Sequence, residues 1–253
     1  MQPQPPPSSP HSRTRALGRL SVAWLLAAVS SCGLCLRGSG NVVHEERTIG
    51  AFHTLEIDGS ADVVAVPAGS IEGGDLRITT DDNLMEHVTT RVKNGKLVIN
   101  TGDSVCLSPS GPLTVFATLD GLRALSIDGS GDVKCEYLIE GDELRVEIDG
   151  SGSVSLGAVR FDRIEASIDG SGNVELSGST QRLEVSIDGS GDVDAFGLAA
   201  EDGKVDIDGS GDVGLVVTGH LDVDIDGSGD VTYHGKPGKL TTRVEGSGDV
   251  RSR

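Results

Sequence analysis

Aspartate and serine recur along the chain in a seven-residue segment that could carry metal or acid–base chemistry. Its most regular form is IDGSGDV, as at residues 187–193. The two aspartates are four residues apart, and carboxylate oxygens are preferred ligands of Ca²⁺. Glycosidases also use paired carboxylates, one as the acid and the other as the base or nucleophile. The repeated segment is therefore a candidate both for cation sites and for a catalytic pair.

Calcium binding is supported by a likeness to the Gly- and Asp-rich nonapeptides of calcium-binding β-rolls. Stacked copies would place aspartates in columns, and their like charges would need screening by solvent or cations. The spacing argues against this interpretation. A β-roll has one Asp-rich loop in every nine residues, whereas the regular part of this chain has one copy in every 18–21 residues. The cation candidates are Asp128, Asp132, Asp188, Asp192, Asp208, Asp212, Asp226 and Asp230.

The second aspartate of the segment is replaced in two of the copies. Ser153 stands there in one copy and Asn173 in another. Neither side chain is charged, but both can accept a hydrogen bond from a backbone N–H at a turn, as aspartate can. This pattern keeps the hydrogen-bond acceptor and not the charge. It favours turn capping over cation binding, which stays the alternative.

Catalytic and nucleotide-binding interpretations have less support. Residues 209–214 match the GxGxxG spacing, but a strand pattern follows where a dinucleotide site needs a helix, and Asp212 would repel phosphate. The carboxylates are equivalent copies, so no pair has the contrasting environments of an acid and a base. No GxSxG elbow occurs, and no metal-binding spacing relates His44, His53, His87, His220 and His234. We expect no catalytic residue and no bound cofactor.

The repeat itself predicts the fold. Eight copies begin at residues 57, 127, 148, 168, 187, 207, 225 and 244. Apolar residues alternate on both sides of a copy, as in Leu183, Val185 and Ile187, which is the period of a strand. A unit of about 20 residues has no room for a crossover helix. We therefore expect an all-β, parallel β-solenoid in which each unit forms one coil.

Alternation also predicts which side chains point inward. Ile, both glycines and Val of the segment face the core, whereas the two aspartates and the serine face solvent. The second glycine is Ala61 in the first copy, so that position requires a small residue more than positive φ. The segment is thus predicted to form the corner of each coil. The same parity places Cys135 in the core.

We expect a single solenoid domain at 41–253, with a less regular part at 41–120 and regular repeats at 121–253. In the irregular part the sequence predicts a helical turn at 81–88, a hairpin around Asn94-Gly95 and a loop at 107–112. It is expected to add strands and to cover the first coil. At the other end, basic residues either protect the edge of the last coil or form a solvated tail: Lys236, Lys239, Arg243, Arg251 and Arg253.

The first 31 residues have the features of an export signal. A basic stretch precedes an apolar run at 20–31, which is too short to span a bilayer comfortably. The run ends in VSSC at 29–32, which resembles a bacterial lipobox, so we expect lipidation of Cys32 and a short linker at 32–40. The alternatives are an ordinary cleaved signal and an uncleaved anchor. All three place the remaining chain outside the cytoplasm, in the cell envelope.

The net charge indicates which classes of partner the protein can bind, and the cysteines indicate its redox chemistry. A formal charge of -18 disfavours nucleic acid and favours cations or cationic surfaces. Cys32 and Cys35 form a CxxC pair, but its place at the end of the export signal argues against a redox motif. Cys106 and Cys135 either form a disulfide or stay as two unpaired thiols.

Three stretches together resemble the head GIN domain family, a bacterial group of unknown function labelled as auto-transporter adhesins. They are GSGNVVHEERTIGAFHTLEIDGSADVVAV at 38–66, DDNLMEHVTTRVKNGKLVI at 81–99, and the serial IDGSGDV units. The resemblance covers residues 38–253. It implies a right-handed β-helix on an exported, often lipid-anchored protein, and it brings no catalytic residues. The expected function is adhesion, binding or a structural role in the envelope. A calcium-binding β-roll-like module and a carbohydrate-active enzyme are the alternatives.

Overall fold

The computed structural model describes residues 35–101 and 106–253. The predicted export signal and Cys32 lie outside the described residues. In the described part of the chain, no helix is both long and apolar enough to cross a membrane.

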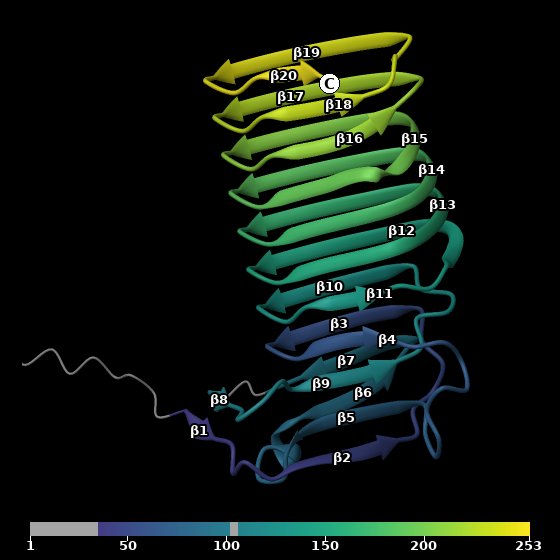
Figure 1. Cartoon of the computed structure of the whole chain (residues 1–253), viewed down its shortest axis with the longest axis vertical. Helices are drawn as coiled ribbons and strands as arrows, with labels where there is room; N and C mark the ends of the chain where they lie inside the picture. The colour runs from purple at the N-terminus through teal and green to yellow at the C-terminus, as the bar shows by residue number, and fades with distance from the viewer. Residues whose placement is uncertain (1–34, 102–105) are drawn as a thin grey trace, which may run out of the picture. The chain divides into compact units, whose positions relative to one another are not determined.

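The described residues form a β-solenoid of about 20 residues per coil, which confirms the predicted fold class (Figure 1). An 18-stranded sheet is wound into two facing layers. Strands of the first layer run up to the corner, and most end in the Ile-Asp-Gly of the repeat: β3 (Thr54–Gly59), β10 (Ala124–Gly129), β12 (Ile139–Gly150) and β17 (His220–Gly227). Two others belong to the same layer, β7 (Lys96–Asn100), which ends in Ile-Asn, and β19 (Lys239–Gly246), which ends in Val-Glu-Gly. Strands of the second layer follow the corner: β4 (Asp62–Ala65), β9 (Thr114–Ala117), β11 (Val133–Cys135), β16 (Val213–Val217), β18 (Val231–His234) and β20 (Val250–Ser252).

Three long strands belong to both layers. Each begins in the second layer, bends around the side opposite the repeat corner, and ends in the first layer: β13 (Ser153–Gly170), β14 (Asn173–Gly189) and β15 (Asp192–Gly209). All neighbouring coils in this region pair in parallel, with each repeat in register with the next, so that Ile168 lies beside Ile187 and Asp169 beside Asp188. Equivalent residues of successive coils therefore form straight columns.

The core lies between the two layers and follows the predicted parity, except that the first glycine of each internal copy is only partly buried. Ile127 and Val133 are 0% and 1% exposed, and equivalent residues of the other internal coils are buried to the same degree. The aspartates of the segment lie at the surface, and the second glycine of each internal copy is buried. Cys135, at 1% exposure, is a core residue as expected. Burial raises the pKa of its thiol.

The first glycine of each copy makes the corner possible. Its φ lies between +116° and +138° in all eight copies, a region that side chains with a Cβ rarely adopt. A Cβ on Gly189 would also collide with the carbonyl oxygen of Gly170 in the preceding coil. That same carbonyl accepts a hydrogen bond from the N–H of Ser190 at 2.8 Å. The corner thus has room for a backbone hydrogen bond between coils but none for a side chain.

The second glycine is needed for its size, as Ala61 suggested. It has no positive φ in any copy. A Cβ on Gly152 would lie 2.9 Å from Cγ2 of Ile127 and against the carbonyl of Gly131. The restriction is therefore packing between coils.

The irregular N-terminal part explains the long gap between the first two copies. The β3–β4 coil lies between the β7–β9 coil and the β10–β11 coil, because β3 pairs with both β7 and β10. After β4 the chain leaves the stack to build one end of it, and it returns on the other side of β3. The strands that cover this end are β2 (Val42–Arg47), β5 (Leu76–Asp81) and β6 (Thr89–Lys93).

Two local predictions for this part are confirmed. Asn94 and Gly95 have φ of 54° and 75° and join β6 to β7 as an antiparallel hairpin. A short 3₁₀ helix, η1 (Met85–His87), lies within the expected helical turn.

Neither alternative for Cys106 and Cys135, a disulfide between them or two unpaired thiols, matches the structure. Cys106 is bonded to Cys35, and Cys135 is free and buried. The physical reason is placement, since Cys135 points into the core while Cys106 is exposed near the covered end. Beside the bridge, β1 (Leu36–Arg37) pairs in parallel with β8 (Leu107–Ser108), so the segment after Cys35 is held to the solenoid.

Replacing Gly189 with alanine should destabilise the protein by about 2–3 kcal/mol, because the new Cβ requires a strained φ and meets the coil below. Urea unfolding followed by circular dichroism measures this loss. Ser190→Ala, which changes an exposed side chain at the same corner, should cost little. Equal stability of Gly189→Ala and wild type would contradict the proposed role of the corner glycine.

Candidate binding surface at the repeat corners

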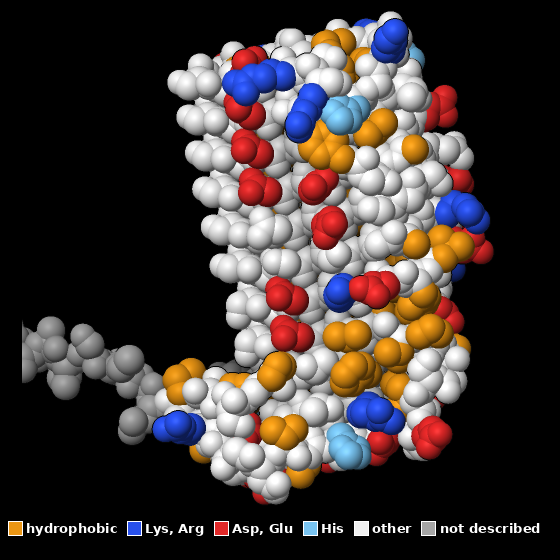
Figure 2. All heavy atoms as spheres, in the orientation of Figure 1, with side chains coloured by type: hydrophobic (Ala, Val, Ile, Leu, Met, Phe, Trp, Pro, Cys, Tyr) orange, Lys and Arg blue, Asp and Glu red, His pale blue; other side chains and the backbone are white. Residues whose placement is uncertain are grey.

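The repeat corners carry two columns of acidic side chains separated by serine. The first column contains Asp58, Asp128, Asp149, Asp169, Asp188, Asp208 and Asp226, with Glu245 in the last coil. The second column contains Asp62, Asp132, Ser153, Asn173, Asp192, Asp212, Asp230 and Asp249. Figure 2 shows acidic side chains one above another along the solenoid. We call the two columns and the serines between them the corner ridge.

Second-column aspartates connect one coil to the next. Oδ1 of Asp192 accepts the backbone N–H of Asp212 at 2.9 Å, and Oδ1 of Asp212 accepts that of Asp230 at the same distance. Equivalent bonds join Asp230 to Asp249 and Asp132 to Ser153. Because an amide donor stabilises an ionised carboxylate, these bonds offset part of the repulsion within the column.

The two uncharged residues of this column do not act as acceptors, contrary to the capping argument from sequence. The N–H of Asn173 bonds the carbonyl of Gly152 at 3.1 Å, and that of Asp192 bonds the carbonyl of Gly172 at 3.2 Å. Where the side chain below is Ser153 or Asn173, a backbone carbonyl thus takes the role of the carboxylate. The capping function predicted for aspartate is present, but it runs between coils and not within one turn.

At both ends of the second column the electrostatic environment differs. Partial burial raises the pKa of Asp62, against the lowering effect of the N–H of Asp132. In the last coil, hydrogen bonding to Arg251 lowers the pKa of Asp249. Arg251 also lies 3.4 Å from Asp230. The basic residues near the C-terminal end therefore neutralise this part of the ridge.

The eight cation candidates are aligned in columns but not gathered into ligand groups. Among residues 35–101 and 106–253, no three acidic, histidine or cysteine side chains are arranged to hold a metal ion. Four of the candidates, Asp132, Asp192, Asp212 and Asp230, already use a carboxylate oxygen to accept an amide of the next coil.

Sequence reasoning missed a network of ion pairs on the outer face of the first layer. Glu165 bonds Arg145 at 2.7 Å and Arg163 at 2.5 Å, and Arg163 reaches Glu184 at 2.7 Å. These pairs join three successive coils. The signal was present, because Arg145, Glu165 and Glu184 occupy equivalent places in successive repeats, with Arg163 two residues before Glu165.

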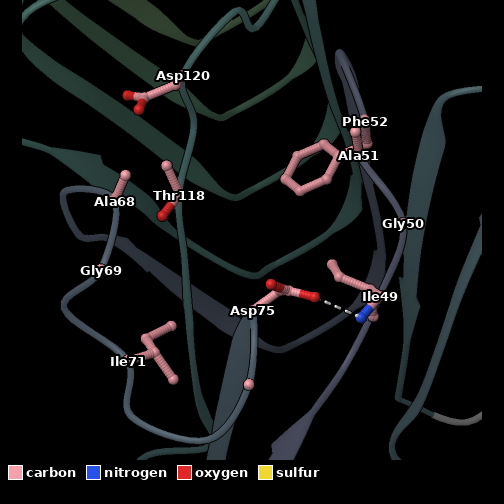
Figure 3. A pocket seen from close by; sticks show the side chains of 11 residues that line it. Ile49, Gly50, Ala51, Phe52, Ala68, Gly69, Ile71, Asp75, Thr118 and Asp120 are labelled. Carbon is pink, nitrogen blue, oxygen red and sulfur yellow. Dashed lines mark hydrogen bonds between the residues drawn. The ribbon is translucent and has the colours of Figure 1, made fainter.

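A pocket of about 420 Å³ near the covered end was also missed (Figure 3). Ile49, Phe52 and Ile71 form apolar parts of its wall, and Thr118 and Asp120 add polar groups. The carboxylate of Asp75 accepts the N–H of Ile49 at 3.0 Å, which holds the two loops together. The pocket is built from loops far apart in sequence, so no motif marks it.

Comparison with known proteins connects this architecture to a family. The model of the family described as "putative auto-transporter adhesin, head GIN domain" matches residues 51–237. The chain belongs to this family. The match is shorter than the span expected from the resemblance, but it includes both the irregular part and most of the repeats. No match was found among curated proteins.

Solved structures share the fold. A structure titled as a putative adhesin from Bacteroides fragilis has a TM-score of 0.80 at 21% identity, covering 86% of this chain and 100% of that one. A structure titled as a putative lipid binding protein from Parabacteroides distasonis has a TM-score of 0.70 at 25% identity, covering 86% and 99%. One titled as a putative adhesin from Parabacteroides merdae has a TM-score of 0.67 at 22% identity, covering 86% and 98%.

The aspartate bonds between coils predict a difference between the two columns. Asp212→Ala should lower the free energy of unfolding by about 1 kcal/mol, because it removes the acceptor of the Asp230 N–H. Asp212→Asn should cost less, because a backbone carbonyl accepts the corresponding amide where Asn173 stands in this column. Asp208→Ala, in the first column, should be neutral or slightly stabilising, since it relieves repulsion. Urea titrations compare the three, and equal losses for Asp212→Ala and Asp208→Ala would contradict the assignment.

Proposed function

We propose that this protein is an exported, lipid-anchored and non-catalytic binding protein that presents the corner ridge to a cationic partner at the cell surface. The family and the structures that share its fold support a binding or adhesin role. The remaining parts of the proposal rest on the chain's own charges and cysteines.

The single observation that carries the ligand class is the exposed first column of the ridge. From Asp128 to Asp226, no ion pair to a Lys, Arg or His side chain involves this column within the described part of the chain. Adjacent strands lie about 4.8 Å apart, so the column concentrates negative potential along one edge. Such an edge attracts cationic peptides or surfaces and repels anionic ones.

Export is supported by the Cys35–Cys106 disulfide, because such bonds persist in oxidising compartments outside the cytoplasm. The bridge lies three residues after Cys32, a reach of about 10 Å in an extended chain. A lipid on Cys32 would therefore tether the chain close to the bridge, at the end that β2, β5 and β6 cover. This arrangement would leave the ridge clear of the membrane, and two acyl chains would make the attachment stable.

Neutralising the first column should abolish binding to a cationic probe. A variant with Asn at Asp149, Asp169, Asp188 and Asp208 is compared with wild type for binding to immobilised oligolysine at low salt. The matched control removes four exposed acids away from the ridge, with Gln at Glu140, Glu143 and Glu201 and Asn at Asp142. We expect at least a tenfold loss for the ridge variant alone. Equal losses in the two variants would show that only net charge matters.

The lipid anchor is tested by labelling bacterial cells that express the chain with radioactive palmitate. Label should enter wild type and the Cys35→Ala variant, and Cys32→Ala should remove it. Label that persists in Cys32→Ala would contradict the anchor, and so would an unlabelled wild-type chain.

A further inference from the structure

One end of the described stack leaves core positions open. Leu240 and Val244 of β19 are 43% and 40% exposed, although they stand in register with Leu221 and Ile225, which are 1% and 0% exposed. β19 pairs with β17 on one edge, and in the described residues no strand lies on its other edge. The opposite end of the stack is covered by β2, β5 and β6 (Figure 1).

We propose that this edge is a dimerisation surface, where β19 pairs in antiparallel orientation with β19 of a second copy about a twofold axis through Thr242. In this register Leu240 lies opposite Val244 of the second copy, on the core side of the sheet. Lys239 lies opposite Glu245 of the second copy, on the outer side. The first layer of the solenoid then continues from one copy into the other, and the exposed apolar side chains of β19 pack against each other across the axis.

The charges of β19 select this register. A shift by one residue would turn the core side of one strand to solvent, so allowed registers differ by two residues. One neighbouring register places Lys239 opposite Arg243 of the second copy. The other places Arg243 opposite its own equivalent. Like charges directly opposite each other destabilise a strand pair, whereas opposite charges stabilise it. The register centred on Thr242 pairs opposite charges and still overlaps the whole strand.

Neighbouring side chains lower the cost of bringing two basic edges together. Arg243 contacts Glu245 at 2.5 Å and Asp224 at 3.2 Å, and Arg251 contacts Asp249 at 2.9 Å. These arginines therefore carry their own counter-charges. The repulsion expected of two basic edges is thereby reduced, and Glu245 bridges Arg243 of its own strand and Lys239 of the second copy.

The contact has a defined stoichiometry and a geometric consequence. Because a twofold contact uses the same end of each copy, assembly closes at the dimer and forms no filament. If Cys32 anchors the chain as proposed above, the two lipids lie at opposite ends of the dimer. Such a dimer would connect two membranes, as a self-binding adhesin does. Only this last step rests on the proposed function.

Sedimentation of the full chain with Cys32 replaced by alanine tests the interface without the anchor. The chain with an unchanged β19 should sediment as a monomer–dimer equilibrium. Lys239→Glu or Glu245→Lys should weaken it at least about tenfold, because each creates two like-charge pairs. The double variant that combines Lys239→Glu with Glu245→Lys should restore dimerisation, because it exchanges the two charges and keeps them opposite. Glu143→Lys, which also breaks a contact to an arginine on its own strand, is the control and should change nothing. A monomer at all concentrations would overturn the proposal, as would failure of the double exchange to rescue.

Oxidative crosslinking tests the register directly. Thr242→Cys places two thiols opposite each other across the twofold axis, and an added oxidant should join them into a covalent dimer. Thr241→Cys faces Arg243 of the second copy and should crosslink poorly. Similar crosslinking in both variants would contradict the register.

A vesicle experiment tests whether the dimer connects two membranes. Vesicles that carry the lipidated wild-type chain should aggregate, and vesicles that carry the lipidated Glu245→Lys variant should not. A dimer that forms in solution without vesicle aggregation would contradict the anchor and leave the interface standing.

Discussion

The close approach of successive coils at the glycine corner is the constraint on which the rest of the structure depends. Each corner stacks on the one below with a serine N–H donated to a glycine carbonyl, at 2.7–2.9 Å in the regular repeats. A side chain at the first glycine would break this contact through both its φ and its volume. The requirement recurs in every coil, which explains why the segment is repeated with so little change.

Stacking in exact register has an electrostatic cost that the fold offsets in different ways. In the second column, carboxylates accept amides from the next coil, and Arg251 neutralises the end. Within the described residues, the first column from Asp128 to Asp226 has neither kind of partner, and it faces solvent. Structural stacking and an exposed acidic edge are thus two results of the same repeat.

Properties that repeat with the coil could be predicted from sequence. Alternation in residues such as Leu183, Val185 and Ile187 gives the strands, the core side and the corner, and Ala61 separates the roles of the two glycines. Properties that depend on the path of 41–120 could not be predicted. The pairing of Cys35 with Cys106 and the position of the β3–β4 coil between two later coils require knowledge of where the chain returns to the stack. The roles of Ser153 and Asn173 were misjudged because a backbone carbonyl can replace a side-chain acceptor at the same amide.

Amide hydrogen exchange of the corner serines measures the central claim most directly. The N–H groups of Ser171, Ser190 and Ser210 lie next to exposed side chains, yet each is bonded to a glycine carbonyl of the preceding coil. If the corners hold the coils together, these amides should exchange as slowly as those of the buried strands beside them. Exchange at the rate of an open loop, while the strands stay protected, would contradict the account.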